Sequence, residues 1–338
     1  MDQHKHYFPV NDLAPRDEER TAVFFKKLMG SKSDGFVVVD NGKVFVIDIG
    51  KRDDVELIHF LAALRDKWLG DRCLSNGNIA KLELTLIISH SHSDHIGALP
   101  HLINDERFCI TDIYAPKRPY LSLGVSGALP PLVESENRLE SICEELSKKG
   151  HTARGITRMP YGKACTIPSG SADCVLKIYP SHIDWSEDRP CDHEDFRFLL
   201  ANNPATYQND TILGCTNGIL NGNSLWVKVV KGERSVLITG DQRDSDEMLG
   251  AMIRHYGEKE FACDVLKIPH HGQNNYSPYL LSVADPQFAV FTSALEKATP
   301  DTVKLCEEMG CVSYYTCDGN LFFHMSKKEI RACGIEPR

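Results

Sequence analysis

The chain has 338 residues, of which 42% are hydrophobic, and its formal net charge at pH 7 is −9. This length and apolar content can bury a sizeable core, as one large domain or one domain with an insertion, and we favour a single domain over residues 1–338. The acidic balance and the lack of a basic stripe disfavour nucleic acid as a partner, although a local positive patch could still bind it.

The chain also lacks the marks of a membrane or exported protein. No apolar run approaches the roughly 18 residues that span a bilayer, and the polar start Met1-Asp2-Gln3-His4 is unlike a signal peptide. The 12 cysteines are scattered without a Cys-x-x-Cys pair, which favours reduced thiols. We therefore expect a cytoplasmic protein with no membrane partner, and the sequence leaves its oligomeric state open.

Apolar periodicity predicts helices at about 16–29, 53–69, 131–149, 244–256 and 299–309, with strands between them. Residues 320–325 are expected to form a closing edge strand. This alternation of strands and helices predicts a layered α/β fold. The stretch from about 104 to 215 is expected to be an insertion that carries specificity.

The segment that follows the predicted strand 82–88 is dense in potential metal ligands. His90, His92, Asp94 and His95 lie within six positions, at the point where the chain turns and a helix begins. His90 and His92 are two apart and project the same way from an extended backbone, whereas Asp94 and His95 lie beyond them where a helix begins. One pair can therefore face one metal ion and the second pair another. A polar surface turn is the alternative, but chance seldom produces this spacing. Imidazole with carboxylate suits Zn²⁺, Mn²⁺ or Fe²⁺.

Two later strand ends can supply the remaining ligands. The strand 235–239 runs into Gly240-Asp241, and we expect Asp241 to bridge two ions, although Gly-Asp turns are often only solvated. The strand 265–268 runs into Pro269-His270-His271-Gly272, where the glycine permits a tight turn. One of these histidines should be a ligand. We favour His270, which is nearer the strand, and expect His271 to touch the substrate.

These motifs, His-x-His-x-Asp-His, Thr-Gly-Asp and Pro-His-His-Gly in this order, resemble those of the metallo-β-lactamase superfamily. The resemblance covers roughly residues 34 to 325. It implies a four-layer αββα sandwich of two mixed β-sheets flanked by helices, which holds two divalent ions, Zn²⁺ first and Mn²⁺ or Fe²⁺ as alternatives. The segment Val44–Gly50 resembles the family's early strand, in which Asp48 would support the ligands from behind.

Within the superfamily, the chain looks most like the hydrolase domain of competence-type DNA-uptake proteins and like phosphorylcholine esterases. The residues that carry this likeness are Asn223-Ser224-Leu225-Trp226-Val227, Leu237-Ile238-Thr239-Gly240-Asp241 and Ile268-Pro269-His270-His271-Gly272.

One departure concerns the first metal site. Many family members have a further histidine shortly before the bridging aspartate, where this chain has Asn217, Asn221 and Asn223. Asn223, and His182 further upstream, are candidates for an additional metal or substrate contact. An amide oxygen is a poorer zinc ligand than imidazole, so the first site is expected to be the weaker one or to prefer a harder ion such as Mn²⁺.

The predicted activity is that of a metal-dependent hydrolase, in which a metal-activated hydroxide attacks the substrate. Asp94 and Asp241 are the expected catalytic carboxylates. The leading substrate is a phosphodiester, either a small phosphoester or nucleic acid, because the nearest-looking relatives act on phosphoesters. The alternatives are a carboxylic ester, lactone or amide cleaved at the same site and, in another class, a non-catalytic binding module with a partial metal site.

Overall fold

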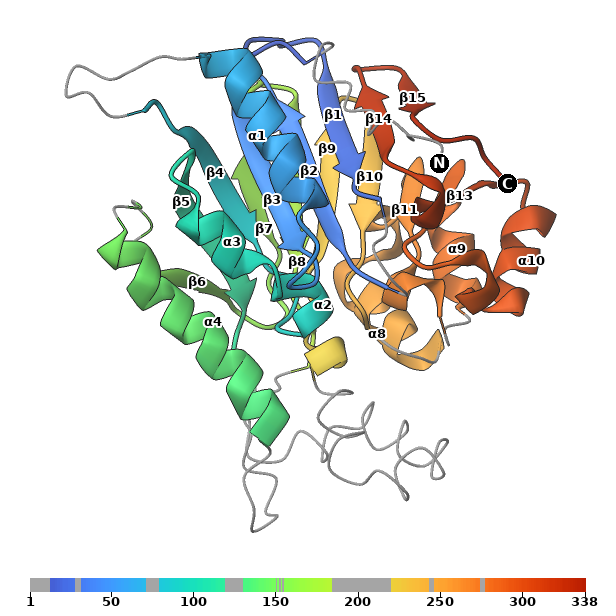
Figure 1. Ribbon diagram of the computed structural model, residues 1–338. Coiled ribbons are helices and arrows are strands. Elements are labelled where there is room, and N and C mark those ends of the chain that lie inside the picture. The colour runs from blue at the N-terminus through green and yellow to red at the C-terminus, as the bar shows by residue number, and fades with distance from the viewer. Residues whose placement is uncertain are drawn as a thin grey trace.

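Two mixed β-sheets form the centre of the computed structural model, with helices on both outer faces (Figure 1). The structure describes residues 13–27, 32–70, 79–118, 130–149, 151, 153, 155–183, 220–242, 246–273 and 277–338. The eight-stranded sheet runs, in spatial order, β15 (Ile330–Cys333), β14 (Leu321–Met325), β1 (Thr21–Phe25), β2 (Gly35–Asp40), β3 (Lys43–Ile49), β4 (Leu82–Ile87), β5 (Phe108–Pro116) and β6 (Ile156–Met159). The seven-stranded sheet runs β13 (Val312–Tyr315), β12 (Phe288–Phe291), β11 (Val265–Lys267), β10 (Arg234–Ile238), β9 (Trp226–Lys231), β8 (Cys174–Tyr179) and β7 (Cys165–Pro168).

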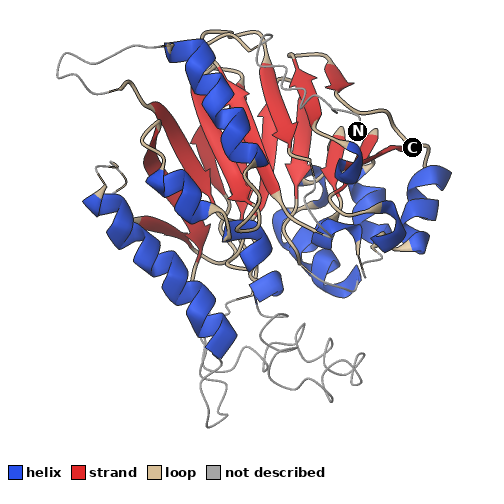
Figure 2. Ribbon diagram, viewed as in Figure 1, coloured by secondary structure: helices blue, strands red, loops and turns tan. Residues whose placement is uncertain are grey.

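The helices cover the outer faces of the two sheets (Figure 2). The eight-stranded sheet is covered by α1 (Glu56–Leu69), α3 (Leu99–Asn104) and α4 (Pro130–Lys148), and the seven-stranded sheet by α8 (Asp246–Tyr256), α9 (Pro278–Ala284) and α10 (Pro300–Glu308). Short helical turns complete the chain: α2 (Ser93–Ile96), η3 (Glu258–Glu260), η4 (Pro269–Gly272), η5 (Leu295–Lys297) and η6 (Thr316–Asp318). The predicted αββα sandwich is confirmed. None of the described helices has the length and apolarity needed to cross a bilayer.

The central strands are apolar on both faces because both faces are covered. In β1, Val23 and Phe25 join the core between the sheets, and Phe24 joins the core beneath the helices. Phe24 stacks on Phe60 of α1 at a centroid distance of 4.3 Å and lies 4.6 Å from Phe322 of β14. Because successive side chains of a strand point to opposite faces, β1 packs both into the core between the sheets and into the core beneath the helices.

Two secondary-structure predictions are wrong. The predicted helix at 16–29 contains β1 instead, because Thr21-Ala22-Val23-Phe24-Phe25 pairs with β2 and β14 and is buried on both faces. Its β-branched and aromatic side chains fit this environment. The strand at 320–325 exists as β14 but is not an edge, since β15 pairs with its outer side.

The other four helix predictions agree with α1, α4, α8 and α10 within a few residues. The described part of the range 104–215, for which we expect an insertion, contributes β5 to β8 to the two sheets. Residues 184–215 of that range lie outside the described residues.

Candidate metal centre

The strand ends that carry the sequence motifs meet at one end of the sandwich. In the eight-stranded sheet, β3 and β4 are parallel; Asp48 is the second-last residue of β3, and the histidine cluster follows the end of β4. In the seven-stranded sheet, β10 and β11 are parallel and end before Asp241 and His271. Backbone hydrogen bonds tie the two sheets together here, among them Leu225 N to Ser89 O at 2.9 Å.

Asp48 holds the His95 ring from behind. It accepts hydrogen bonds from Ser89 N (2.7 Å) and Ser89 Oγ (2.6 Å), and it lies 2.7 Å from His95 Nδ1. The Nδ1–H therefore donates to the carboxylate, and Nε2 points the other way, toward Asp241 Oδ2 at 3.2 Å, where the neutral ring would offer its lone pair to a metal ion. Asp48 adopts a left-handed conformation with φ 54°, which turns the chain at the end of β3.

His90 and His92 form a second group of nitrogen donors. His90 Nε2 and His92 Nδ1 lie 2.9 Å apart. Because the Ser89 hydroxyl donates to Asp48, it accepts from His90 Nδ1 at 3.0 Å and leaves His90 Nε2 with a lone pair. The two ring nitrogens that face one another, His90 Nε2 and His92 Nδ1, can thus bind a common cation.

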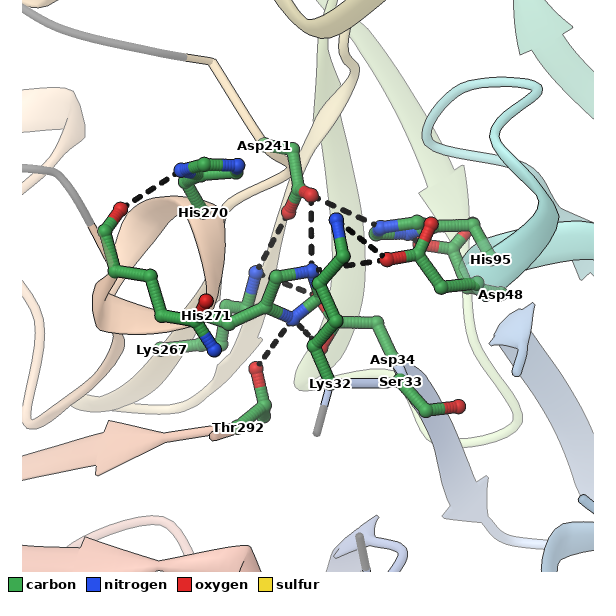
Figure 3. Close-up of polar contacts among 12 residues, drawn as sticks. Lys32, Ser33, Asp34, Asp48, His95, Asp241, Lys267, His270, His271 and Thr292 are labelled. Atoms are coloured by element: carbon green, nitrogen blue, oxygen red, sulfur yellow. Dashed lines mark hydrogen bonds and ion pairs between the residues drawn. The ribbon is translucent and has the colours of Figure 1, made fainter. Parts of the chain in front are cut away.

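Asp241 and His271 bring the seven-stranded sheet into the site (Figure 3). His271 Nε2 lies 2.9 Å from Asp241 Oδ2. It also lies 3.5 Å from Asp94 Oδ2. Asp241 N donates to the Ser224 hydroxyl at 3.2 Å, so the Asn223-Ser224 pair of the sequence motif supports the loop that carries Asp241. A Cβ atom on Gly240 would lie 2.4 Å from Ser224 Cβ, which explains the glycine at that position.

Of the two adjacent histidines, the structure places His271 in the cluster of possible ligands and not His270, which the sequence favours. His271, with no exposed surface, joins the cluster, whereas His270 Nδ1 lies 2.7 Å from Gln273 O and His270 lines the neighbouring pocket. Both residues have positive φ, 50° and 60°. This left-handed turn swings the second histidine, not the one nearer the strand, toward the ligands.

Two site residues were missed by the sequence analysis, namely Asp34 and Lys267. Asp34, just before β2, lies 3.0 Å from His271 Nδ1 and forms one cluster with His95, Asp241 and His271, in which the possible ligand atoms lie within 4.8 Å of one another. Lys267 ends β11 and contacts both Asp34 and Asp241. A lysine inside the apolar run Val265–Ile268 was the available signal, because such a charge is buried only with a partner.

The additional candidates His182 and Asn223 lie outside this cluster. The His182 ring is 6.0 Å from that of His255, and Asn223 Nδ2 donates to Lys117 O at 2.9 Å. Asn221, which is 1% exposed, is instead the asparagine that lines the pocket beside His92.

A pocket of about 230 Å³ opens over the histidine cluster. Its described lining consists of Lys32, Lys51, His92, Ser93, Asp94, Asn221 and His270. Lys32 Nζ lies 3.0 Å from Asp94 Oδ2. The pocket thus gives access to the ligands and has positive charge at its rim.

The carboxylates dominate the electrostatics around His95 and His271. Burial alone would lower the pKa of His271, but the charges of Asp241 and Asp34 outweigh it and raise that pKa to about 10. Burial likewise opposes the raised pKa of His95, which Asp241 and Asp48 hold well above its usual range. These two nitrogens therefore face a potential that favours a cation.

His90 and His92 behave in the opposite way. Burial, together with the charges of His95 and His92, lowers the pKa of His90 well below its usual value. Burial is also the main cause that lowers the pKa of His92, to about 4. Both rings are thus neutral near pH 7, which is the form that binds a metal.

The residues fit a metal site. Four buried side-chain atoms converge here without a hydrogen bond of good geometry among the described residues: Asp94 Oδ2, His95 Nε2, Asp241 Oδ2 and His271 Nε2. Leaving such atoms unsatisfied is costly, whereas imidazole and carboxylate donors together suit Zn²⁺ and related ions. The donor set can therefore hold divalent metal.

No protein-family model and no curated protein matches the chain. Solved structures do resemble it. The metallo-β-lactamase fold protein YhfI from Bacillus subtilis aligns over 93% of this chain and 100% of its own, with 9% identity and a TM-score of 0.47. Zn²⁺-bound PqqB from Methylobacterium extorquens aligns over 89% and 99%, with 9% identity and a TM-score of 0.45. The short form of human tRNase Z aligns over 82% and 94%, with 11% identity and a TM-score of 0.39. These distant likenesses carry no information on activity.

Proposed function

We propose that this chain is a metal-dependent hydrolase of the metallo-β-lactamase superfamily that cleaves a phosphodiester. The observation that carries the proposal is the convergence of buried donor atoms from Asp94, His95, Asp241 and His271 next to the facing nitrogens of His90 and His92. A pair of divalent ions bound there would supply a water of lowered pKa and polarise the ester.

The chain's own residues have distinct roles in this proposal. His95, Asp94, Asp241 and His271 would hold one ion, and His90 with His92 the other. Asp241 Oδ2, which lies 3.2 Å from His95 Nε2 and 2.9 Å from His271 Nε2, is the candidate bridge. Asp94 is the acidic group beside the pocket, where it can orient a water molecule through hydrogen bonding.

The positive rim supports an anionic substrate. Lys32 and Lys51 line the same pocket as Asp94, and their ammonium groups can pair with a phosphate. A small phosphoester agrees with this local charge and with the overall charge of −9, which disfavours a long nucleic-acid contact. A cytoplasmic location and the likeness to competence-type proteins and phosphorylcholine esterases remain part of the proposal.

A non-catalytic binding module is the second candidate, because Asn221 lines the pocket beside His92 and belongs to the segment in which the resemblance implies a further histidine for the first site, that of His90 and His92. An amide oxygen binds zinc more weakly than imidazole does. If the first site does not fill, the chain could bind one ion without turnover.

Metal content and turnover test these candidates together. We would purify the protein without chelator, count metal ions by plasma mass spectrometry, and assay bis-p-nitrophenyl phosphate and p-nitrophenyl acetate with added Zn²⁺ or Mn²⁺. Near two ions per chain and turnover of the phosphodiester support the proposal. Turnover of the acetate alone would instead support a carbonyl hydrolase, and one ion or none without turnover would support the binding module.

The two adjacent histidines provide a matched pair of variants. His271→Ala is expected to lose metal and all turnover, because its Nε2 faces Asp241 Oδ2 at 2.9 Å. His270→Ala is expected to keep the metal content of the parent. The reverse pattern would refute the ligand set.

A further inference from the structure

A buried ion pair lies directly behind the proposed ligands and joins the two sheets. Lys267 Nζ, at the end of β11, lies 2.5 Å from Asp34 Oδ2, just before β2. Neither residue has any exposed surface. Lys267 Nζ also lies 3.4 Å from Asp241 Oδ1 and 3.3 Å from Gly240 O, and Asp34 N donates to Asp94 O at 3.1 Å.

Each member of this pair holds a different proposed ligand (Figure 3). Asp34 Oδ1 accepts from His271 Nδ1 at 3.0 Å, with Thr292 Oγ1 a further neighbour of that nitrogen at 3.1 Å. Lys267 faces the outer oxygen of Asp241, Oδ1. The remaining donors, His271 Nε2 and Asp241 Oδ2, are thereby directed at one another at 2.9 Å.

Both carboxylate oxygens of Asp34 are already engaged, one with His271 and the other with Lys267. Asp34 belongs to the buried cluster of possible ligands, but these contacts give it the position of a support and not of a ligand. An ion pair this deeply buried is also a weak source of stability, because desolvation offsets the attraction between the charges. Its contacts with two ligands give it another role.

We propose that Asp34 and Lys267 are positioning residues that orient His271 and Asp241 for metal binding. In the neutral ring that binds metal, Asp34 selects the His271 tautomer whose Nε2 lone pair is free, and Lys267 occupies Asp241 Oδ1 so that only Oδ2 is offered to metal. The inference rests on the proposed function, since it requires His271 and Asp241 to be ligands.

The test is a Co²⁺ titration of the full chain after chelator treatment, followed by visible absorbance. The double variant Asp34→Asn/Lys267→Met removes the pair without changing the net charge, so it separates orientation from simple charge. We expect Co²⁺ affinity about 10- to 100-fold below that of the parent, the range found when groups supporting metal ligands are removed, and an altered absorbance spectrum. Affinity within about threefold of the parent, with an unchanged spectrum, would overturn the proposal.

The chain offers a matched control at the opposite end of β2. Lys231 and Asp40 are both fully buried, with 3.8 Å between Lys231 Nζ and Asp40 Oδ1. Lys231→Met/Asp40→Asn makes the same chemical change away from the ligands. It should retain the Co²⁺ affinity of the parent, and an equal loss in this control would mean that the effect is general destabilisation, which also overturns the proposal.

Should the double variant fail to fold, Asp34→Asn alone supplies the test. Its amide keeps the volume of Asp34, but the oxygen is expected to turn to Lys267 and the NH₂ group to His271 Nδ1. In the Zn²⁺-loaded protein, ¹⁵N side-chain spectra should then lose the Nδ1-protonated tautomer of His271, with weaker binding. An unchanged tautomer and affinity would refute the positioning role.

These readouts use no substrate. A parent that binds Co²⁺ but cleaves no ester would therefore refute the proposed hydrolase while leaving the positioning role standing. A parent that binds no Co²⁺ would refute both.

Discussion

Replacing Asp48 by asparagine should weaken metal binding while leaving the fold intact. The carboxylate accepts from Ser89 N, Ser89 Oγ and His95 Nδ1 at 2.6 to 2.7 Å. If the amide oxygen keeps the bond to Ser89 N, the NH₂ group faces His95 Nδ1, which must then act as an acceptor. The ring proton moves to Nε2, where it points at Asp241 and blocks the lone pair that metal needs.

The expected size of the effect follows from the loss of one oriented ligand. Removing a carboxylate that holds a metal-ligating histidine typically costs 10- to 100-fold in affinity, or about 1.4 to 2.7 kcal/mol. Asparagine tolerates the left-handed backbone of Asp48, which has φ 54°, so strain should add little. The substitution therefore isolates the tautomer of His95.

Competition with a chromophoric chelator would measure Zn²⁺ affinity of the parent and of Asp48→Asn. Asp40→Asn is the control, because Asp40 is equally buried and hydrogen-bonded to Thr21 and Ser171, away from the ligands. Equal Zn²⁺ affinity in Asp48→Asn and the parent would refute the reasoning. So would an equal loss in Asp40→Asn.

Three further predictions concern stability and the η4 turn. His151 accepts a hydrogen bond from Ile110 N at 3.0 Å and lies 3.1 Å from Ile103 O, and burial lowers its pKa. Its contribution to stability should therefore be present above the unfolded pKa of about 6.5 and decline as the pH falls below that value. Urea unfolding of His151→Gln should show a weaker pH dependence in that range than the parent does. Phe60→Ala removes a fully buried ring from the aromatic stack under α1, so urea unfolding should report a loss of about 3–5 kcal/mol, and a loss below about 1 kcal/mol would contradict this packing. Gly272→Ala introduces a Cβ atom 2.3 Å from Phe291 Cδ1 at a φ of +82°. Co²⁺ titration should therefore show a lower affinity and thermal unfolding a lower melting temperature. Unchanged values would mean that the turn is free to adjust.

The sequence alone predicted the architecture and most of the candidate site. Strands that end in clustered metal ligands, separated by amphipathic helices, already indicated a layered α/β fold with its ligands at the strand ends. His90, His92, Asp94 and His95 were identifiable because they lie within six positions of one another, where local spacing alone fixes which way each side chain projects.

Predictions from local sequence patterns were wrong for two segments whose neighbours in the sheet are distant in the sequence. The helix predicted at 16–29 took in residues 21–25, but they form β1 because β2 and β14 pair with both of its edges. Residues 321–325 were expected at an edge, but β15 covers them. Strand pairing over such separations does not show in the local periodicity.

Only the tertiary structure decided which groups meet behind the ligands. The choice of His271 over His270 depends on two consecutive left-handed residues, which no spacing rule anticipates. Asp34 and Lys267 are separated by more than two hundred positions and come from different sheets, so their ion pair exists only once the sandwich has closed. A buried charge requires a partner, but the fold alone determines which residue that partner is.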